Sequence, residues 1–271
     1  MLVFGGNVAN LKGKKKVFCI LGIVFAIILC LIVSVSIIAN INVKAMNKCA
    51  DSALNIVKNN FEVIKIDLGE KSTMKLNGFM KFDIEQYDIK NIGNLSIMKM
   101  NMGLMQMLTF VITPVHKNMP LLSADYMYIL GTRKSYLEYY DLVEKKDSSY
   151  WKLMNSLSSV IKNFDNLESI EATPAWYANL LTVKSYKTGK IKNDNQVQSL
   201  LENSLLAYLD YAKNIENLSA EKLQQKKEIT VNYTDGLIEK GGISTDVFKK
   251  SLGNEATKVF FDEIFFGTAN Y

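Results

Sequence analysis

The chain has 271 residues, with 32 basic and 27 acidic side chains, one histidine and three cysteines. Arg133 is the only arginine, and no basic stripe alternates with aromatic residues, so the composition excludes the usual modes of nucleic-acid recognition. A single histidine and the lack of a GxxxxGK[ST] loop or a GxGxxG turn give no support to zinc chemistry or nucleotide binding.

The first feature along the chain is an apolar segment, Val17–Ala39, whose 23 residues carry no charge. A helix of about 20 apolar residues crosses a bilayer core of about 30 Å. A cleaved secretion signal is the alternative, but its apolar core has about 7 to 15 residues and ends in a small-x-small site, which Ile37–Asn40 matches poorly. We therefore expect residues 17–39 to be one uncleaved transmembrane helix, with the lipid bilayer as its partner.

Lysines flank this segment unequally, with four before it and only Lys44 and Lys48 soon after it. Positive flanks stay in the cytoplasm, so residues 1–16 are expected to be cytoplasmic and the rest extracytoplasmic, in a single-pass protein of the cell membrane. Beyond residue 40 the chain has 28 basic and 27 acidic residues, so the net charge of +5 belongs mostly to the membrane flank.

Residues 40–60 are predicted to form a linker helix that packs on the body of the protein. Its apolar residues recur at helical spacing, at Val43, Met46, Ala50, Leu54 and Val57. The remaining residues, 61–271, have an ordinary size for a single domain.

Short apolar runs with polar connections follow, and they predict strands. Parallel neighbours would need a crossover of about a dozen residues, so these short connections indicate an antiparallel sheet. The expected strands are Phe61–Ile66, Phe79–Ile89, Leu95–Met102, Met105–Thr113, Ala124–Leu130 and Ser135–Leu142.

After Ser148 the period becomes helical. Ser244 and Asn254 are expected to cap two closing helices, the second of which ends at Gly267. Strands followed by helices predict an α+β fold in which helices cover an antiparallel sheet. The other expected helices are Trp151–Ile161, Pro174–Thr182, Val197–Ala212 and Glu221–Lys240, the last stopped by Gly241 and Gly242.

Methionine is concentrated in one region, where seven of the twelve fall between residues 98 and 127. Met98, Met100 and Met102 share one face of a predicted strand, and Met107 lies on the next strand. Thioether side chains are soft and adaptable, so this face suits a flat apolar ligand or, in principle, Cu(I). A flexible hydrophobic core under a helix is the other interpretation.

The second candidate region is Thr113–Met127, which contains Asp125 among apolar neighbours at the start of a predicted strand. Burial raises the proton affinity of a carboxyl, so Asp125 is a candidate acid; a turn or cap residue is the alternative. His116 lies in a polar loop between two prolines and is expected to be a surface residue.

At this region the chain resembles the ferredoxin-dependent bilin reductases and their relative, red chlorophyll catabolite reductase. The similar stretches are Met105–Pro114, Met119–Asp125, Tyr136–Leu142 and, at the far end, Gly253–Gly267. These are loose patterns of proline, glycine and apolar residues, and the resemblance covers roughly residues 61 to 266.

The resemblance implies an α/β/α sandwich with a linear tetrapyrrole bound between the sheet and the C-terminal helices. It implies reduction by single electrons from a ferredoxin, without a bound metal or organic cofactor. Asp125 matches the family's aspartate and would be the proton donor, while the methionine face would line the pocket. A ferredoxin partner requires that the domain lie in the cytoplasm.

The chain also departs from the family pattern. Where the family has a histidine and a glutamate two residues apart, this chain has Leu95–Met100 without an acid, and Thr109 occupies a position where many members have a second histidine. Two functions therefore stay open: a membrane-anchored oxidoreductase of the bilin reductase kind, and a non-catalytic cell-surface binding or interaction module for an apolar ligand or a protein.

Overall fold

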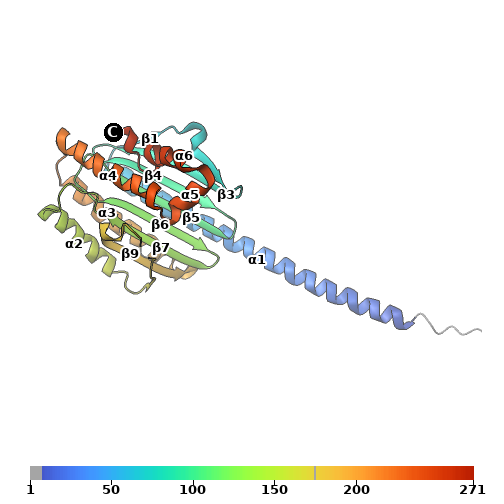
Figure 1. Ribbon diagram of the computed structural model, residues 1–271. Coiled ribbons are helices and arrows are strands. Elements are labelled where there is room, and N and C mark those ends of the chain that lie inside the picture. Colours follow the sequence, from blue (N-terminus) through green and yellow to red (C-terminus); the bar gives the residue numbers. More distant parts are fainter. Residues whose placement is uncertain (1–7, 174) are drawn as a thin grey trace, which may run out of the picture.

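A computed structural model describes residues 8–173 and 175–271 of the chain (Figure 1). Its centre is a nine-stranded antiparallel sheet in the order β1-β3-β4-β5-β6-β7-β9-β8, with β2 paired to β3. The strands are β1 (Val63–Ile66), β2 (Thr73–Leu76), β3 (Met80–Ile89), β4 (Gly93–Asn101), β5 (Met105–Pro114), β6 (Leu121–Ile129), β7 (Thr132–Tyr140), β8 (Glu168–Ser169) and β9 (Leu181–Lys190).

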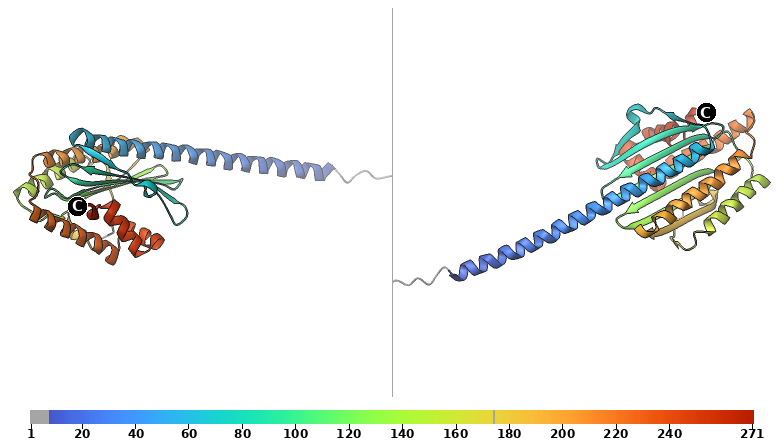
Figure 2. Two further views of the ribbon diagram at one scale, coloured as in Figure 1. Left: turned by 90° about the horizontal axis from the view of Figure 1, so that it is seen from above. Right: turned by 180° about the vertical axis from the view of Figure 1, so that it is seen from behind.

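Helices cover both faces of this sheet (Figure 2). One face carries α1 (Val8–Asn60), α2 (Ser148–Lys162) and α3 (Asp194–Lys213). The other carries α4 (Ala220–Lys240), α5 (Ile243–Leu252) and α6 (Asn254–Phe260), which a π-helical turn continues to Phe265. The expected α/β/α sandwich with a central antiparallel sheet is confirmed.

The face under α3 is a dry hydrophobic core. Residues 200, 201, 205, 208 and 209 of α3 recur at helical spacing and are completely buried. They belong to one cluster with Tyr126, Leu137 and Tyr139 of the sheet. Burial of each such side chain contributes about 1.5 to 3 kcal/mol, so this layer stabilises the fold strongly.

The opposite face is closed at one corner by polar contacts to the C-terminal turn. The Asn94 amide and the Ser96 hydroxyl donate to the backbone carbonyl of Ile264, at 3.2 and 2.7 Å. Gly267 follows with φ of 67°, and a Cβ there would lie 2.5 Å from Asn94, so only glycine fits this turn. The predicted end of the last helix at Gly267 is confirmed.

The helix α1 is continuous from its apolar half to the half that packs on the sheet (Figure 1). Its large apolar side chains between Leu21 and Ile37 are exposed, whereas Met46, Ala50 and Val57 are buried in the core. The first part of the helix is long and apolar enough to cross a membrane.

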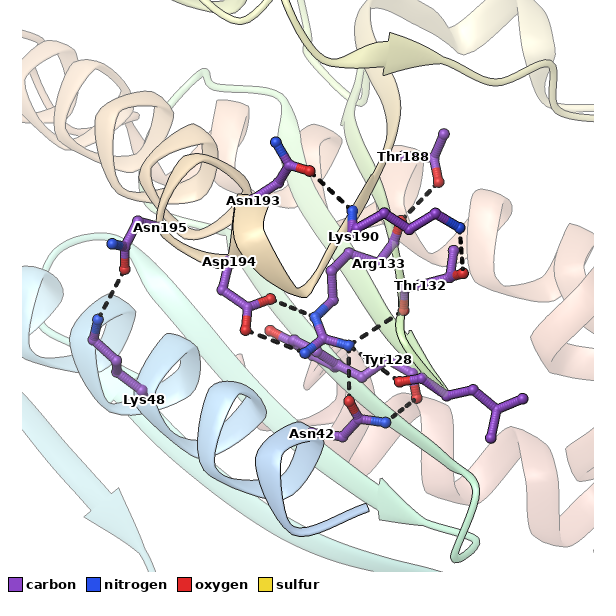
Figure 3. Close-up of polar contacts among 11 residues, drawn as sticks. Asn42, Lys48, Tyr128, Thr132, Arg133, Thr188, Lys190, Asn193, Asp194 and Asn195 are labelled. Carbon is purple, nitrogen blue, oxygen red and sulfur yellow. Dashed lines mark hydrogen bonds and ion pairs between the residues drawn. The ribbon is translucent and has the colours of Figure 1, made fainter. Parts of the chain in front are cut away.

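Arg133, the single arginine, fixes α1 to the sheet (Figure 3). Its guanidinium is fully buried and donates to Asn42 Oδ1 of α1 at 2.7 Å. It also forms a two-point ion pair with Asp194 at the start of α3, and it lies 5.0 Å from the centre of the Tyr128 ring. One side chain therefore joins α1, the β6–β7 turn and α3.

The structure corrects the segment expected to be a helix at Pro174–Thr182. Pro174 lies outside the described residues, Ala178–Leu180 is a single 3-10 turn, and Thr182 belongs to β9. Ser185 and Lys187 occupy inward positions of β9, so this strand lacks the apolar alternation that would have revealed it.

The two expected helix caps are also wrong. The helix α5 begins at Ile243 after Gly242, and α6 begins at Asn254 after Gly253, so Ser244 and Asn254 lie inside the helices. The helices follow one another through glycines, which leaves no room for a separate capping residue.

We predict that Arg133→Met lowers the free energy of unfolding by about 3 kcal/mol, because it leaves Asp194 and Asn42 without their charged partner. Lys192→Met, at an exposed position near the same end of the sheet, is the control and should change stability by less than about 0.5 kcal/mol. Urea unfolding of the full chain in detergent, followed by tryptophan fluorescence, measures both. Equal effects would contradict the structural role of Arg133.

Candidate functional site

Asp125 lies in the middle of β6, on the sheet face that α4, α5 and α6 partly cover. It is opposite Thr109 of β5 and Tyr136 of β7, and it is half-buried. The Thr109 hydroxyl donates to Asp125 Oδ1 at 2.5 Å. This hydrogen bond from β5 therefore holds the Asp125 carboxyl in one orientation.

A second carboxylate, Glu138, lies on the same face two residues farther along β7, opposite Ser123. It accepts hydrogen bonds from the hydroxyls of Tyr140 and Tyr186, each at 2.6 Å. Glu138 was not among the residues predicted from the sequence. Its position could have been inferred from the expected strand Ser135–Leu142, because Tyr136, Glu138 and Tyr140 alternate along it.

The environment of Asp125 favours its protonated form. Burial raises its pKa to about 6, the charge of Glu138 acts in the same direction, and the hydrogen bond from Thr109 partly opposes them. A carboxyl with this pKa exchanges its proton near neutral pH, which suits it to donate or accept one.

Aromatic side chains surround the two carboxyls. The rings of Tyr136 and Tyr186 lie 5.5 Å apart on the sheet, and Tyr140 lies 5.0 Å from Tyr233 of α4. Tyr177, from the segment before β9, lies 5.6 Å from Tyr140. Sequence reasoning missed Tyr186 because it did not recognise β9.

Trp176 holds this segment against α4. Its indole donates to the carbonyl of Gly241 at 2.8 Å. Its ring packs so close to the helix that a Cβ at Gly236 would lie 2.6 Å from it. The neighbouring Tyr177 is thereby positioned beside the site, where burial and the charges of Glu138 and Asp125 raise its pKa.

The four methionines predicted to bind a ligand all belong to the side of the sheet that bears Asp125. Met98 and Met100 are only 3% exposed and pack into the core beneath the C-terminal helices. Met102 and Met107 are half-buried at the edge of that core. Met107 pairs with Met127, another half-buried side chain, so these two lie on the more open part of the face next to Asp125.

The face around Asp125 is only partly covered by the helical layer. A small enclosed cavity of about 10 Å³ lies elsewhere, between Thr113, Lys226 and Tyr271, and Asp125 does not line it. Half-buried side chains border Asp125 on the strands: Met107, Met127, Tyr136 and Tyr186.

Lys226 of α4 is a second unusual titratable group. It is fully buried, and burial lowers the pKa of its ammonium to about 7. Its Nζ donates to the carbonyls of Met119 and Leu142, which ties α4 to two connections of the sheet. We interpret Lys226 as a structural residue because both of its acceptors are backbone groups.

Two other side chains with reactive groups, Cys49 and His116, take no part in this site. Cys49 is buried in the core, where burial raises the pKa of its thiol to about 12. His116 is half-buried in the β5–β6 connection, and its ring lies edge-on to that of Tyr271 at 5.5 Å. Neither side chain is within the group that surrounds Asp125.

Comparison with known proteins gives a structural likeness without a sequence match. No family model matches the chain, and no curated protein matches it. Among solved structures, the fold is similar to that of phytochromobilin synthase from tomato, which was crystallised in complex with biliverdin. The TM-score is 0.67 at 16% identity, and the match covers 83% of each chain, so it shows a shared fold.

We predict that Asp125→Asn stabilises the folded protein at pH 7.5 by about 2 kcal/mol. The pKa of Asp125 is about 6 in the folded protein, above its ordinary value of 3.8. The stability that the protonated carboxyl contributes therefore falls as the pH rises from about 4 to 6, and it is lost above pH 6. The amide cannot ionise, which removes this loss. The gain should shrink by about half at pH 5.

Thermal unfolding at the two pH values measures this difference. Asp83→Asn, at an exposed carboxylate on β3, is the matched control and should show no comparable gain. A gain for Asp125→Asn that does not change with pH would contradict the raised pKa.

Proposed function

We propose that this protein is a membrane-anchored domain that binds a linear tetrapyrrole, or a ligand of the same flat and largely apolar kind, on the sheet face that bears Asp125. The observation that carries the proposal is a carboxyl of raised pKa among tyrosine and methionine side chains. Aromatic faces and thioethers suit the plane of such a ligand, and a carboxylate suits its ring N–H groups.

The likeness of fold supports the choice of ligand. The tomato phytochromobilin synthase holds biliverdin, and the sequence resemblance to bilin reductases includes the stretch Met119–Asp125. A ligand between the sheet and the C-terminal helices would contact Met107, Met127 and Tyr136 directly. Met98 and Met100 would support it from the core.

Asp125 is our proposed proton donor if the bound bilin is reduced. A one-electron carrier of the ferredoxin class would supply two electrons in turn, and each would be matched by a proton. One double bond of the bilin would become a single bond, and two new C–H or N–H bonds would form. Asp125 would deliver one proton and regain it from solvent. Glu138, bound to two tyrosine hydroxyls, is the nearest candidate relay for the other.

The second candidate function is a binding module without turnover. It is favoured by the strand Gly93–Asn101, which presents Ser96, Met98 and Met100 to this face and no acid. It is also favoured by Thr109, which donates to Asp125 and offers no titratable proton.

The long apolar helix supports the anchoring part of the proposal. Large apolar side chains exposed from Leu21 to Ile37 are stable in lipid and unfavourable in water. The lysine asymmetry around this segment favours an extracytoplasmic domain, and that location would favour binding over ferredoxin-dependent reduction.

Titration of the full chain in nanodiscs with biliverdin tests the ligand. We expect a red or blue shift of the biliverdin absorption bands on binding. Asp125→Asn should weaken binding by about tenfold through loss of a charge-assisted hydrogen bond. Asp83→Asn should leave affinity unchanged, and an unaltered biliverdin spectrum with the native chain would refute the proposal.

Adding reduced ferredoxin separates the two functions. Reduction predicts a progressive bleaching that Asp125→Asn abolishes, with a rate that falls about tenfold per pH unit above pH 6 because the donor must be protonated. The binding module predicts a stable spectrum. Protease treatment of intact cells gives the location: digestion of the domain would exclude a cytoplasmic ferredoxin as its partner.

A further inference from the structure

Three hairpin turns lie together at one end of the sheet. They connect β2 to β3 at Asn77–Gly78, β4 to β5 at Met102–Leu104, and β6 to β7 at Leu130–Gly131. The register fixes their common position, because Lys81 pairs with Asn101 and Met105 pairs with Ile129. The amide of Leu130 also donates to the carbonyl of Leu104 at 3.0 Å, so two of the turns touch.

An exposed apolar side chain lies in or next to each of these turns. Phe79 is 64% exposed, Leu104 48% and Leu130 43%. Single exposed apolar residues are common on protein surfaces. Three of them, from three turns at the same end of one sheet, indicate a surface made for contact. We call Phe79, Leu104 and Leu130 the apolar tips.

Leu130 has a backbone conformation that leucine rarely adopts. Its φ is 51°, a region that disfavours side chains other than asparagine, aspartate and glycine. Two other connections in the sheet meet the same requirement with Asn77 and Asn91. A leucine that is both strained and exposed indicates that an apolar side chain is needed at this turn.

The helix α1 leaves the body at this same end (Figure 2, right). Asn42 contacts Arg133 and the carbonyl of Tyr128 next to the β6–β7 turn (Figure 3). Ile38 and Ala39 are already half-buried, whereas Ile37 is exposed. The apolar segment ends at Ala39, so the body meets α1 within about one helical turn, or about 5 Å, of that end.

A flexible spacer between anchor and body is therefore missing from the described part of α1, which is one helix from Val8 to Asn60. If the apolar segment crosses the bilayer, the turns must lie at the level of the lipid headgroups. Three exposed lysines lie at the same end of the sheet as the turns and would attract anionic headgroups: Lys75, Lys190 and Lys192.

We propose that the apolar tips insert into the surface of the bilayer that α1 crosses, so that the body rests on the membrane in one fixed orientation. The occupant of this surface is the lipid headgroup and upper acyl region, where exposed phenylalanine and leucine side chains are stable. The inference rests on the proposed membrane anchoring. It adds a second contact with lipid, made by the folded domain itself.

Site-specific fluorescence in liposomes tests the contact. The full chain carries Cys19→Ser and Cys30→Ser, while Cys49 stays because it is only 1% exposed and does not react. An NBD probe is attached at Leu104→Cys. The matched control is Ile64→Cys, an equally exposed aliphatic position, 53%, near the opposite end of β3.

Nitroxide lipids labelled high on the acyl chain should quench the probe at residue 104 at least about twofold more than the probe at residue 64. Equal quenching at the two positions would overturn the inference. The anchor is scored separately, by whether the chain stays with the liposomes after alkaline carbonate extraction. Loss of the chain at that step refutes the anchoring, whereas retention with equal quenching refutes only the docking of the tips.

The double variant Phe79→Ser with Leu130→Asn tests the side chains without endangering the fold. Both positions are exposed, and asparagine suits the positive φ at residue 130, so thermal unfolding should occur at the same or a higher temperature. Quenching at residue 104 should fall toward the value at residue 64. A folded double variant with undiminished quenching would also overturn the inference.

Discussion

The buried guanidinium of Arg133 is the interaction on which the arrangement of the molecule depends. A charge with no exposed surface is stable only if its donors are satisfied, and here Asn42 and Asp194 accept from them. Those partners lie 91 and 61 residues away along the chain. The helix α1, a sheet turn and the start of α3 therefore form one body, and movement of any of them would leave the charge unpaired.

The central strands use their two faces for different purposes. Along β6, Ala124 and Tyr126 enter the dry core under α3, while Asp125 and Met127 face the other side. Successive side chains of a strand point to opposite faces, so a slip of one residue would exchange core and site. The core under α1 and α3 fixes the register, and the register in turn holds Asp125 opposite Thr109.

The local parts of this structure could be predicted from the sequence, and the long-range parts could not. Six strands and the buried side of α3 follow from simple periodicity, and Asp125 follows from one acid in an apolar setting. The strand β9 escapes prediction because Ser185 and Lys187 fill its inward positions. Lys187 is accommodated by Asp165 and Ser169, each 3.2 Å from its Nζ.

The candidate site shows the same limit. Asp125 stands out in the sequence, but its raised proton affinity comes first from burial and then from the charge of Glu138. Glu138 is in turn held by Tyr186 of β9, the strand that periodicity does not reveal. The methionine cluster was noticed for its composition alone. The structure divides it between core side chains, such as Met98, and half-buried ones, such as Met107. No spacing rule in the sequence separates these two groups.

The proposed docking of the turns on a bilayer would assign a role to the half-buried methionines. Asp125 lies five residues before Leu130 on one hairpin, or about 17 Å from the turn at about 3.3 Å per residue. Met127 and its partner Met107 lie between the two. With the turns on the bilayer, an apolar ligand dissolved in lipid would pass along thioether surface to reach the carboxyl. The same geometry would keep Asp125 beyond the headgroups, where water could return its proton.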